Sequence, residues 1–177
     1  MLVLKNDTIK IRALEPTDLE FLYTIENDGD YWEVSSTQTP FSKYILKKYL
    51  ANAHQDIYEA KQLRLVIEDN STNKILGLVD LFDFSPQHQR AGIGILIVKE
   101  HQNKGYAFLA LQIFIEYAFK KLNLHQIYAS IPSNNLRSLA LFKKLKFHKI
   151  GIQKDWILSD DKFKDVHLYQ LINKKKK

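Results

Sequence analysis

The chain has 177 residues and a formal net charge of +6, and its length suits one domain with a hydrophobic core. It contains no cysteine, which excludes disulfides, thiolate metal sites and acyl-cysteine intermediates. Lys174 to Lys177 contribute four of these positive charges as a solvated tail, and the other basic residues are dispersed, which argues against nucleic-acid binding. No window approaches the ~20 apolar residues of a membrane helix, and residues 1–14 lack the apolar core of a secretion signal, so we predict a cytoplasmic protein without membrane attachment.

The first third of the chain predicts one strand followed by two helices. Residues 8–14 alternate apolar and polar side chains, as a half-buried strand does. Residues 18–27 predict a helix that fades in the polar stretch at 27–30. A polar loop at residues 33–40 then leads to a second predicted helix over residues 41–56.

The rest of the chain predicts a mixed sheet. Short polar turns favour antiparallel pairing of three strand-like runs, at residues 62–69, 74–85 and 89–98. The pattern then changes to helix, strand, helix, which is typical of a parallel crossover, at residues 105–122, 125–131 and 135–145. Two final strands meet at a hairpin turn, at residues 148–158 and 162–172. The predicted fold is α+β, a single domain with a mixed, mostly antiparallel sheet of about seven strands and about four helices.

The turn before the helix at 105–122 has features of an anion site. That helix is apolar except for the stripe of Gln112, Glu116 and Lys120, so it should pack against the sheet with its start held rigidly. Four backbone N–H groups at a helix start have no partner within the helix, and Gly105 leaves them uncovered beside the charge of Lys104. The turn equally fits an ordinary connection, and it lacks the glycine patterns of Walker and Rossmann nucleotide sites.

Two motifs resemble those of the GCN5-related N-acetyltransferase (GNAT) superfamily. The stretch QNKGYA at residues 102–107 is similar to its Gln/Arg-x-x-Gly-x-Gly/Ala signature, and NLRSLALFKKLKF at 135–147 is similar to its Asn-x-x-Ser…Tyr-x-Lys-x-Gly-Phe stretch. The runs at 9–23 and 76–107 most resemble the branch of ribosomal-protein N-terminal acetyltransferases and bacterial spermidine acetyltransferases. The resemblance implies one N-acetyltransferase domain at residues 1–173, which transfers acetyl directly from acetyl-CoA to a primary amine without a metal.

The resemblance also assigns residues to the cosubstrate. Backbone groups of Ile97 and Val98 would pair with the pantetheine arm as an added strand. Asn135 would reach the same arm, and Phe142 would lie beside it at the position of the family's tyrosine. The pyrophosphate would be held by the turn residues Gln102, Asn103, Lys104, Gly105, Tyr106 and Ala107. From the residues alone, Ile97 and Val98 also fit a strand in the core, and Asn135 also fits a helix N-cap.

The catalytic groups follow less directly from the motifs. The family often uses its tyrosine to protonate the thiolate, but Phe142 has no proton to donate, so Ser138 or a water molecule would replace it. Ser138 also fits a capping or packing role. Asp80 is the preferred base because it matches a glutamate of the spermidine-acetyltransferase pattern, whereas Asp83 would face the other side of the strand. Asp80 also fits a solvent-facing position. Lys146 stands where relatives carry glycine, which predicts a strained or differently closed helix end.

The acceptor is the most open part of the prediction. Spermidine enzymes of this branch carry clustered acidic residues after the first helix, whereas Glu33 is the only acidic residue in the corresponding stretch, residues 33–42. A small amine or a peptide N-terminus therefore fits at least as well as a polyamine, and a CoA-binding protein with little catalysis is a further alternative. Tyr31, Trp32 and Phe41 would line the acceptor side if this loop follows the family, and otherwise belong to the core. The sequence is compatible with an oligomer.

Overall fold

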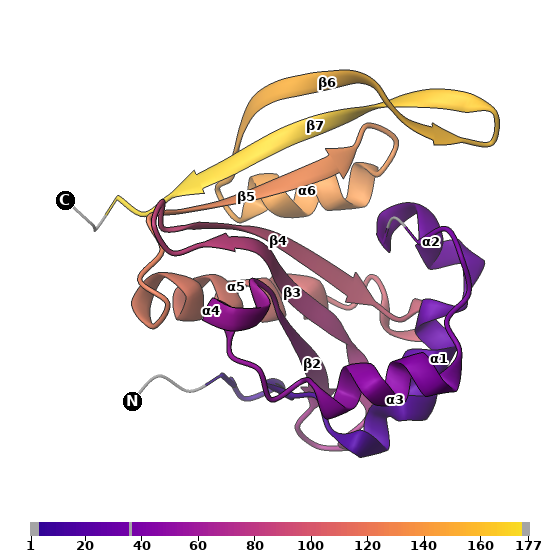
Figure 1. Ribbon diagram of the computed structural model, residues 1–177. Coiled ribbons are helices and arrows are strands. Elements are labelled where there is room, and N and C mark those ends of the chain that lie inside the picture. The colour runs from indigo at the N-terminus through magenta and orange to yellow at the C-terminus, as the bar shows by residue number, and fades with distance from the viewer. Residues whose placement is uncertain (1–3, 36, 175–177) are drawn as a thin grey trace.

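The structure is a computed structural model that describes residues 4–35 and 37–174, without the side chains of Glu33 and Val34. A seven-stranded sheet runs through the molecule, and helices flank it (Figure 1). The strands are β1 (Ile9–Ala13), β2 (Leu63–Asp69), β3 (Ile75–Ser85), β4 (Arg90–Ile97), β5 (Gln126–Pro132), β6 (His148–Ser159) and β7 (Lys162–Ile172). The helices are α1 (Leu19–Glu26), α2 (Gly29–Ser35), α3 (Lys43–Ala51), α4 (Ile57–Ala60), α5 (Tyr106–Lys120) and α6 (Leu136–Lys144), with short 3-10 turns η1 (Pro16–Asp18) and η2 (Lys99–His101).

The strands lie in the order β1-β2-β3-β4-β5-β7-β6. Every neighbouring pair is antiparallel except β4 and β5, which are parallel and are connected through α5. The predicted hairpin is also present, because Ser159 of β6 pairs with Lys162 of β7. The predicted α+β class with one mixed, mostly antiparallel sheet is therefore confirmed.

Alternate side chains of the central strands pack against different helices. Leu65 and Ile67 of β2 belong to the large core cluster that also contains the inner face of α5. Val66, between them, packs with Leu22 of α1 and Leu46 of α3 in a separate cluster. Burial of one such side chain contributes about 1.5–3 kcal/mol. The strands are therefore apolar on both faces because both faces are covered.

The N-terminal helices differ from the prediction. Residues 29–35 form α2, where we expected the polar end of α1 and the start of a loop, because the Asp28 carboxylate accepts the Asp30 N–H at 3.0 Å and starts a new helix. The predicted helix over residues 41–56 is also wrong in extent. It ends at Ala51, and the Asp56 carboxylate accepts the N–H groups of Tyr58 and Glu59 to begin α4.

β4 and β5 pair over a short distance only. Their paired residues are confined to Arg90–Gln126, Ala91–Ile127 and Gly92–Tyr128, whereas β4 continues to Ile97 and β5 to Pro132. Beyond these pairs, β4 remains bonded to β3, and β5 remains bonded to β7. The two strands thus separate and leave a gap in the middle of the sheet.

The described residues end just after β7. Lys174 is exposed, and the remaining residues of the predicted lysine tail, 175–177, lie outside the described residues. Within the part of the chain that the structure describes, no helix is both long and apolar enough to cross a bilayer.

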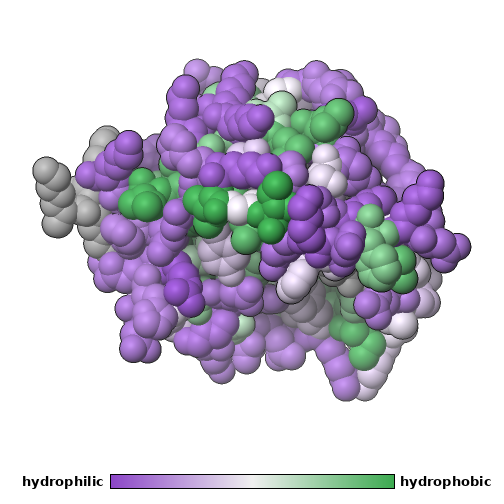
Figure 2. Space-filling model, turned by 90° about the horizontal axis from the view of Figure 1, so that it is seen from above, coloured by the Kyte–Doolittle hydropathy of each residue, from purple (hydrophilic) through white to green (hydrophobic). Residues whose placement is uncertain are grey.

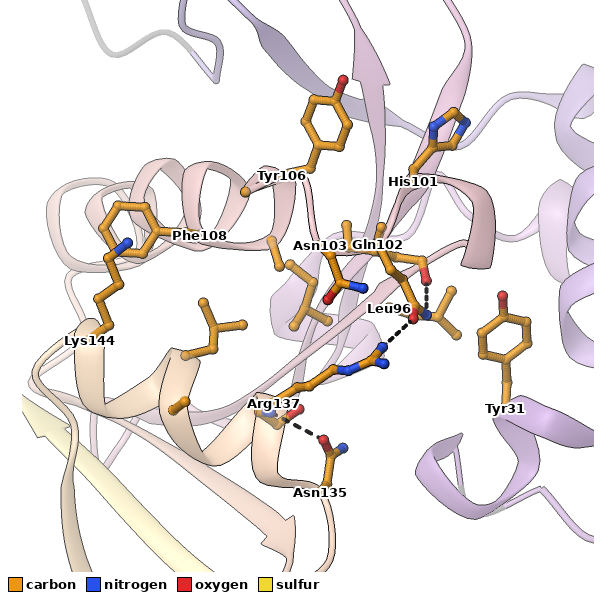
Figure 3. Close-up of a pocket in the computed structure, with 17 residues that line it drawn as sticks. Tyr31, Leu96, His101, Gln102, Asn103, Tyr106, Phe108, Asn135, Arg137 and Lys144 are labelled. Carbon is orange, nitrogen blue, oxygen red and sulfur yellow. Dashed lines mark hydrogen bonds between the residues drawn. The ribbon is translucent and has the colours of Figure 1, made fainter.

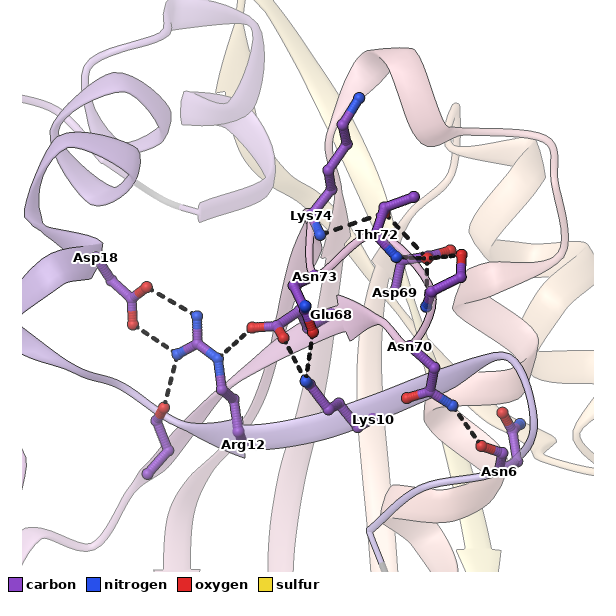
Figure 4. A network of polar contacts seen from close by, with 12 residues as sticks. Asn6, Lys10, Arg12, Asp18, Glu68, Asp69, Asn70, Thr72, Asn73 and Lys74 are labelled. Carbon is purple, nitrogen blue, oxygen red and sulfur yellow. Dashed lines mark hydrogen bonds and ion pairs between the residues drawn. The ribbon is translucent and has the colours of Figure 1, made fainter.

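A buried ion-pair network ties the N-terminal strand to the first helical turn (Figure 4). The Arg12 guanidinium donates to both carboxylate oxygens of Asp18, at 2.8 and 2.9 Å, and also to Glu68. Glu68 accepts a second ion pair from Lys10 at 2.6 Å. Asp18 is 3% exposed and Glu68 6% exposed. Because each buried carboxylate has cationic partners, the network carries no unpaired buried charge.

This network should make stability depend on pH. Burial alone would raise the pKa of Asp18 and of Glu68, but hydrogen bonds and charges of Arg12 and Lys10, together with the Glu15 N–H on Asp18, outweigh it and hold both pKa values below 3.8 and 4.5 respectively. A lowered folded-state pKa contributes stability that is present above the unfolded pKa and is lost as pH falls through the folded pKa. The free energy of unfolding should therefore decrease below about pH 5.

Urea unfolding of the native protein and of Asp18→Asn measures this effect. The variant should be less stable by about 1–3 kcal/mol near neutral pH, because Arg12 loses its bidentate partner but remains paired with Glu68. The stability difference should shrink as the pH is lowered towards 3. A difference that stays constant with pH would show that Asp18 does not carry the dependence.

The C-terminus of α6 closes in a left-handed conformation without glycine. Lys146 has φ +67°, its N–H donates to the Lys143 carbonyl at 2.9 Å, and the Phe147 N–H donates to the Phe142 carbonyl at 3.0 Å. These two bonds form a Schellman motif, and the rings of Phe142 and Phe147 pack edge to face beneath it. The expected departure at Lys146 is thus a strained position within an otherwise regular helix end.

Lys146→Gly should stabilise the protein by about 0.5–1 kcal/mol. Removing the side chain relieves about 1–2 kcal/mol of left-handed strain, and the greater freedom of glycine in the unfolded chain offsets about half of that gain. The midpoint of urea unfolding measures the change. Lys146→Ala is the matched control, because it keeps the strain and should give no gain.

Candidate active site

The gap between β4 and β5 opens into a cavity of about 570 Å³, which we call the donor cavity (Figure 3). Its walls come from the end of β4, the turn at residues 102–107, the start of α5 and one face of α6. The side chains of Asn103 and Arg137 point into this space, whereas the ring of Tyr106 points away from it. The turn singled out in the sequence is therefore one wall of a cavity.

Helix α5 begins at this wall with uncovered N–H groups. Gly105 caps the helix with φ +83°, a left-handed conformation that suits glycine, and no side chain bonds to the helix start. The first hydrogen bond of the helix runs from the Leu109 N–H to the Gly105 carbonyl. The N–H groups of Tyr106, Ala107 and Phe108 precede it, so they and the positive end of the helix dipole are available to an anion.

Gln102 joins the two sides of the donor cavity. Its Nε2 donates to the Ile97 carbonyl at 3.0 Å, and its Oε1 accepts from Nη1 of Arg137 at 2.8 Å. Arg137 lies in the first turn of α6 and lines the cavity, so it places a cation opposite the start of α5. Arg137 was not among the residues predicted from the sequence. The available signal was an arginine two residues after Asn135, in a helix that follows a parallel strand.

The second motif also contributes to the donor cavity. Asn135 caps α6, because its Oδ1 accepts the Ser138 N–H at 3.1 Å, and both residues line the cavity. Asn135 therefore has the N-cap role considered in the sequence analysis and also lies at the predicted site. Lys144 lines the cavity further along α6, with its ammonium 4.4 Å from the centre of the Phe108 ring.

The expectation for Val98 needs correction. The Val98 N–H donates to the Leu76 carbonyl, and the Val98 carbonyl accepts from the His101 N–H, both at 2.9 Å. Val98 is thus bonded towards β3, and the alternation of an antiparallel ladder turns the N–H groups of Ile95 and Ile97 towards the gap instead. Ile95 and Ile97 both line the donor cavity.

Two other predicted cofactor contacts lie elsewhere. The Lys104 ammonium donates to the Glu100 carbonyl at 2.9 Å, and Lys104 is absent from the donor-cavity wall, so Arg137 takes the place expected for its charge. Phe142 is 3% exposed and packs in the core against Phe147, because it lies on the face of α6 turned away from the cavity.

A second cavity, of about 330 Å³, lies next to the donor cavity, and we call it the acceptor cavity. Tyr31, Ile95 and Leu96 line both cavities, so the two meet at the end of β4. Among the described residues that line the acceptor cavity, the charged ones are Glu26 and Asp80, with Arg64 between them. The predicted base Asp80 thus faces a cavity that adjoins the predicted cosubstrate site.

Arg64 bonds to both carboxylates. Its Nε donates to Oδ1 of Asp80 at 2.6 Å, and its Nη1 donates to Oε1 of Glu26 at 2.6 Å. Burial alone would lower the pKa of Arg64, but Asp80, Tyr49 and Glu26 raise it by a larger amount. The pKa of Arg64 is therefore raised overall, and the side chain stays cationic. Arg64 and Glu26 were not predicted from the sequence, because they are 38 residues apart and only the fold brings them together.

The other acceptor-side predictions have different outcomes. Tyr31 lies where expected, and its hydroxyl accepts the Lys99 N–H at 3.0 Å. Trp32 does not line the acceptor cavity, since its indole N–H donates to the Glu26 carbonyl. Phe41 packs in the cluster of α1 and α3 instead. The side chain of Glu33 lies outside the described part of the chain.

Asp83 lies at a bulge that interrupts the alternation of β3, because Leu81 and Phe84, three residues apart, both pack in the large core cluster. The odd spacing therefore does not fix the side of β3 on which Asp83 lies, but Asp83 is absent from the lining of the acceptor cavity. It lies where the pairing of β3 with β4 is irregular, with φ +49°, and its carboxylate accepts the hydroxyl of Tyr128 at 3.1 Å. Burial and the charge of Asp83 raise the pKa of Tyr128 to about 12, which keeps this hydroxyl protonated. Asp80 is therefore the β3 aspartate that faces the acceptor cavity.

Comparison with known proteins adds to this geometry. A family described as the acetyltransferase (GNAT) domain matches residues 8–148. The chain belongs to this GNAT family. The GNAT enzyme is an N-acetyltransferase, and it uses acetyl-CoA as its cosubstrate.

Relatives resemble this GNAT enzyme over most of its length. A spermidine N(1)-acetyltransferase of Vibrio cholerae is 29% identical over 173 residues, which cover 96% of each chain. One from Escherichia coli K12 is 29% identical over 81% of this chain and 75% of the relative. A probable N-acetyltransferase of Bacillus subtilis, YjcK, is 28% identical over 97% of each chain.

Solved structures agree with the fold. The crystal structure of a Vibrio cholerae spermidine N-acetyltransferase in complex with CoA and spermine has a TM-score of 0.85 at 28% identity, over 94% of this chain and 96% of that chain. A dodecameric structure of spermidine N-acetyltransferase from the same organism has a TM-score of 0.79 at 29% identity, over 94% of this chain and 95% of that chain.

Proposed function

We propose that this GNAT enzyme acetylates a small primary amine held in the acceptor cavity. The observation that carries the proposal is the junction of the two cavities at Tyr31, Ile95 and Leu96, because it allows an amine and a thioester to meet. The volume of about 330 Å³ suits a small molecule, and Asp80 in its wall suits a cationic amine.

The donor half of the proposal follows the splayed strands. The pantetheine arm would pair with Ile95 and Ile97 in the gap, in the manner of an added strand. The pyrophosphate would lie on the N–H groups of residues 105–108, facing Arg137. Charge-assisted hydrogen bonds of this kind contribute about 1.5–3 kcal/mol each. Asn135 would fix the arm from α6.

The chemistry requires three events in the ternary complex. The ammonium loses a proton, for which Asp80 is the proposed acceptor, and the free amine then attacks the thioester carbon. A tetrahedral oxyanion forms, and the Ile97 N–H would stabilise it. The new C–N bond persists, the C–S bond breaks, and the second proton of the nitrogen passes through Ser138 or water to the thiolate. A thiol with a pKa near 8.5 is a fair leaving group, so this last proton transfer is not demanding.

A polyamine is the second candidate acceptor, and the relatives named above favour it. Two of them are spermidine acetyltransferases, at 29% identity, and one solved structure holds spermine. The relatives offer no support for a peptide N-terminus as the acceptor. The two candidates differ in charge, since a polyamine carries several ammonium groups along its chain.

An assembly of several subunits is also part of the proposal. The dodecameric relative supports it, and so do the apolar side chains that lie exposed among polar ones on the surface formed by β6 and β7 (Figure 2). Trp156, Leu158 and Phe163 are each more than 60% exposed, with values of 62%, 61% and 63%, and β6 is the edge strand of the sheet. Light scattering on the purified protein measures the assembly.

An acetylation assay across a panel of amines tests the proposed function. Purified enzyme would be incubated with acetyl-CoA and monoamines, polyamines or short peptides with free N-termini, and both thiol release and product mass would be measured. We expect one acetyl group to be added to small amines. Binding of acetyl-CoA without turnover on any amine would instead indicate a CoA-binding protein.

A further inference from the structure

The acceptor cavity holds two carboxylates but has a formal charge of only −1 among its described lining residues. Glu26 and Asp80 contribute the two negative charges, and Arg64 removes one of them. The exposed fractions of these side chains are 12%, 23% and 28%, so solvent screens them incompletely. The cavity is therefore poorer in negative charge than a count of its acids suggests.

Arg64 is held in place by the sheet. It lies on β2 directly opposite Asp80 of β3, and such cross-strand neighbours have side chains within reach of each other. Glu26, at the end of α1, holds the other side of the guanidinium. Two bonds from different elements thus fix the cation in the wall, where an acceptor cannot displace it without leaving a charge unpaired.

The rest of the wall combines apolar side chains with the neutral polar residues Tyr31, Ser35 and Gln62. The apolar lining residues are Ile25, Leu78, Leu81, Phe82, Ile95 and Leu96. Of the two oxygens of Asp80, Arg64 engages Oδ1, which leaves Oδ2 for an ammonium group. A second ammonium group on the same acceptor would find no further net negative charge in the wall, because Arg64 lies between the two carboxylates and offsets one of them.

We infer that Arg64 is a specificity-determining residue, which restricts the acceptor to amines with a single ammonium group on an apolar body. This inference rests on the proposed function and deepens it, because it names the class of amine. The charge of the Arg64 side chain would then decide between the two candidate acceptors, a small monoamine and a polyamine. The preference should then follow the net charge of Glu26, Arg64 and Asp80.

Hexylamine and 1,6-diaminohexane are the matched probes, because they share one carbon chain and differ by one ammonium group. The measured quantity is the ratio of kcat/KM for the diamine to that for the monoamine, per amino group. Arg64→Gln changes the cavity charge to −2, Glu26→Gln changes it to zero, and Arg64→Lys keeps it at −1 as the control.

The native enzyme should prefer hexylamine. The ratio should rise about tenfold in Arg64→Gln and fall about tenfold in Glu26→Gln, as expected for one charge several ångströms away in a partly screened site. Arg64→Lys should leave the ratio close to the native value. A purely structural role for Arg64 would lower both rates together and leave the ratio unchanged in every variant.

Several results would overturn the inference. One is a native preference for the diamine, and another is a ratio that moves in the same direction in Arg64→Gln and Glu26→Gln. If Arg64→Gln does not fold, the shift in Glu26→Gln decides. If the native enzyme acetylates neither probe, calorimetric binding of both amines to the CoA-loaded protein still measures the preference, and the proposed function fails only if no amine of the panel is acetylated.

Discussion

Replacing Gly105 with glutamate should abolish binding of acetyl-CoA while leaving the protein folded. The affinity should fall by more than ~100-fold, because a carboxylate at the start of α5 would lie within a few ångströms of the proposed pyrophosphate. Bulk is not the cause. A Cβ added at Gly105 meets no atom within 4 Å, so the side chain has open space.

The alanine variant separates charge from backbone strain. Gly105 has φ +83°, and any side chain at this position costs about 1–2 kcal/mol in the left-handed conformation. Gly105→Ala carries the same strain without the charge, so it should lose little affinity, although it should melt at a lower temperature. Calorimetric titration with acetyl-CoA and thermal melting measure the two effects separately. Native-like affinity in the glutamate variant would refute the position proposed for the pyrophosphate.

Asp80→Asn should lower kcat by about 100- to 10,000-fold, which is the range of a lost general base. Asparagine keeps the size of the side chain and still accepts a hydrogen bond from Arg64, but it cannot take a proton from the ammonium. The KM for acetyl-CoA should change little, because Asp80 lines the acceptor cavity and not the donor cavity.

Asp83→Asn is the matched control on the same strand. Asp83 accepts the Tyr128 hydroxyl and does not line the acceptor cavity, so its loss should leave kcat within about twofold of the native value. Steady-state kinetics with the best amine of the panel compares the two variants. Equal losses in both variants would indicate damage to β3 and would remove Asp80 from the proposed mechanism.

Local patterns predicted those features that depend on neighbouring residues. The turn at 102–107 and the apolar helix after it could be recognised because Gly105 and the period of α5 are properties of one short segment. Residues 29–35 were misread because Asp28 and Gly29 resemble the end of a helix, and the same residues also start one. Sequence alone does not decide whether such a polar stretch ends one helix or begins the next.

Features that join distant segments were beyond such patterns. Arg137 meets Gln102 across 35 residues, and Arg64 meets Glu26 across 38, so neither pair has a local signature. Phe142 shows the limit of motif transfer. Its position in the motif matches the family's tyrosine, but its ring packs in the core against Phe147. A matched position therefore did not imply a matched environment.

The short pairing of β4 with β5 has a mechanical consequence. Among the described residues, β4 and β5 share only three paired positions along the seam between the strands β1 to β4 and the strands β5 to β7. A pantetheine arm in the gap would form backbone hydrogen bonds where β4 and β5 do not pair, and it would connect the two parts of the sheet. Binding of acetyl-CoA would then reduce the relative motion of the two parts of the sheet. The conformational entropy lost in this way would weaken the affinity of the enzyme for acetyl-CoA.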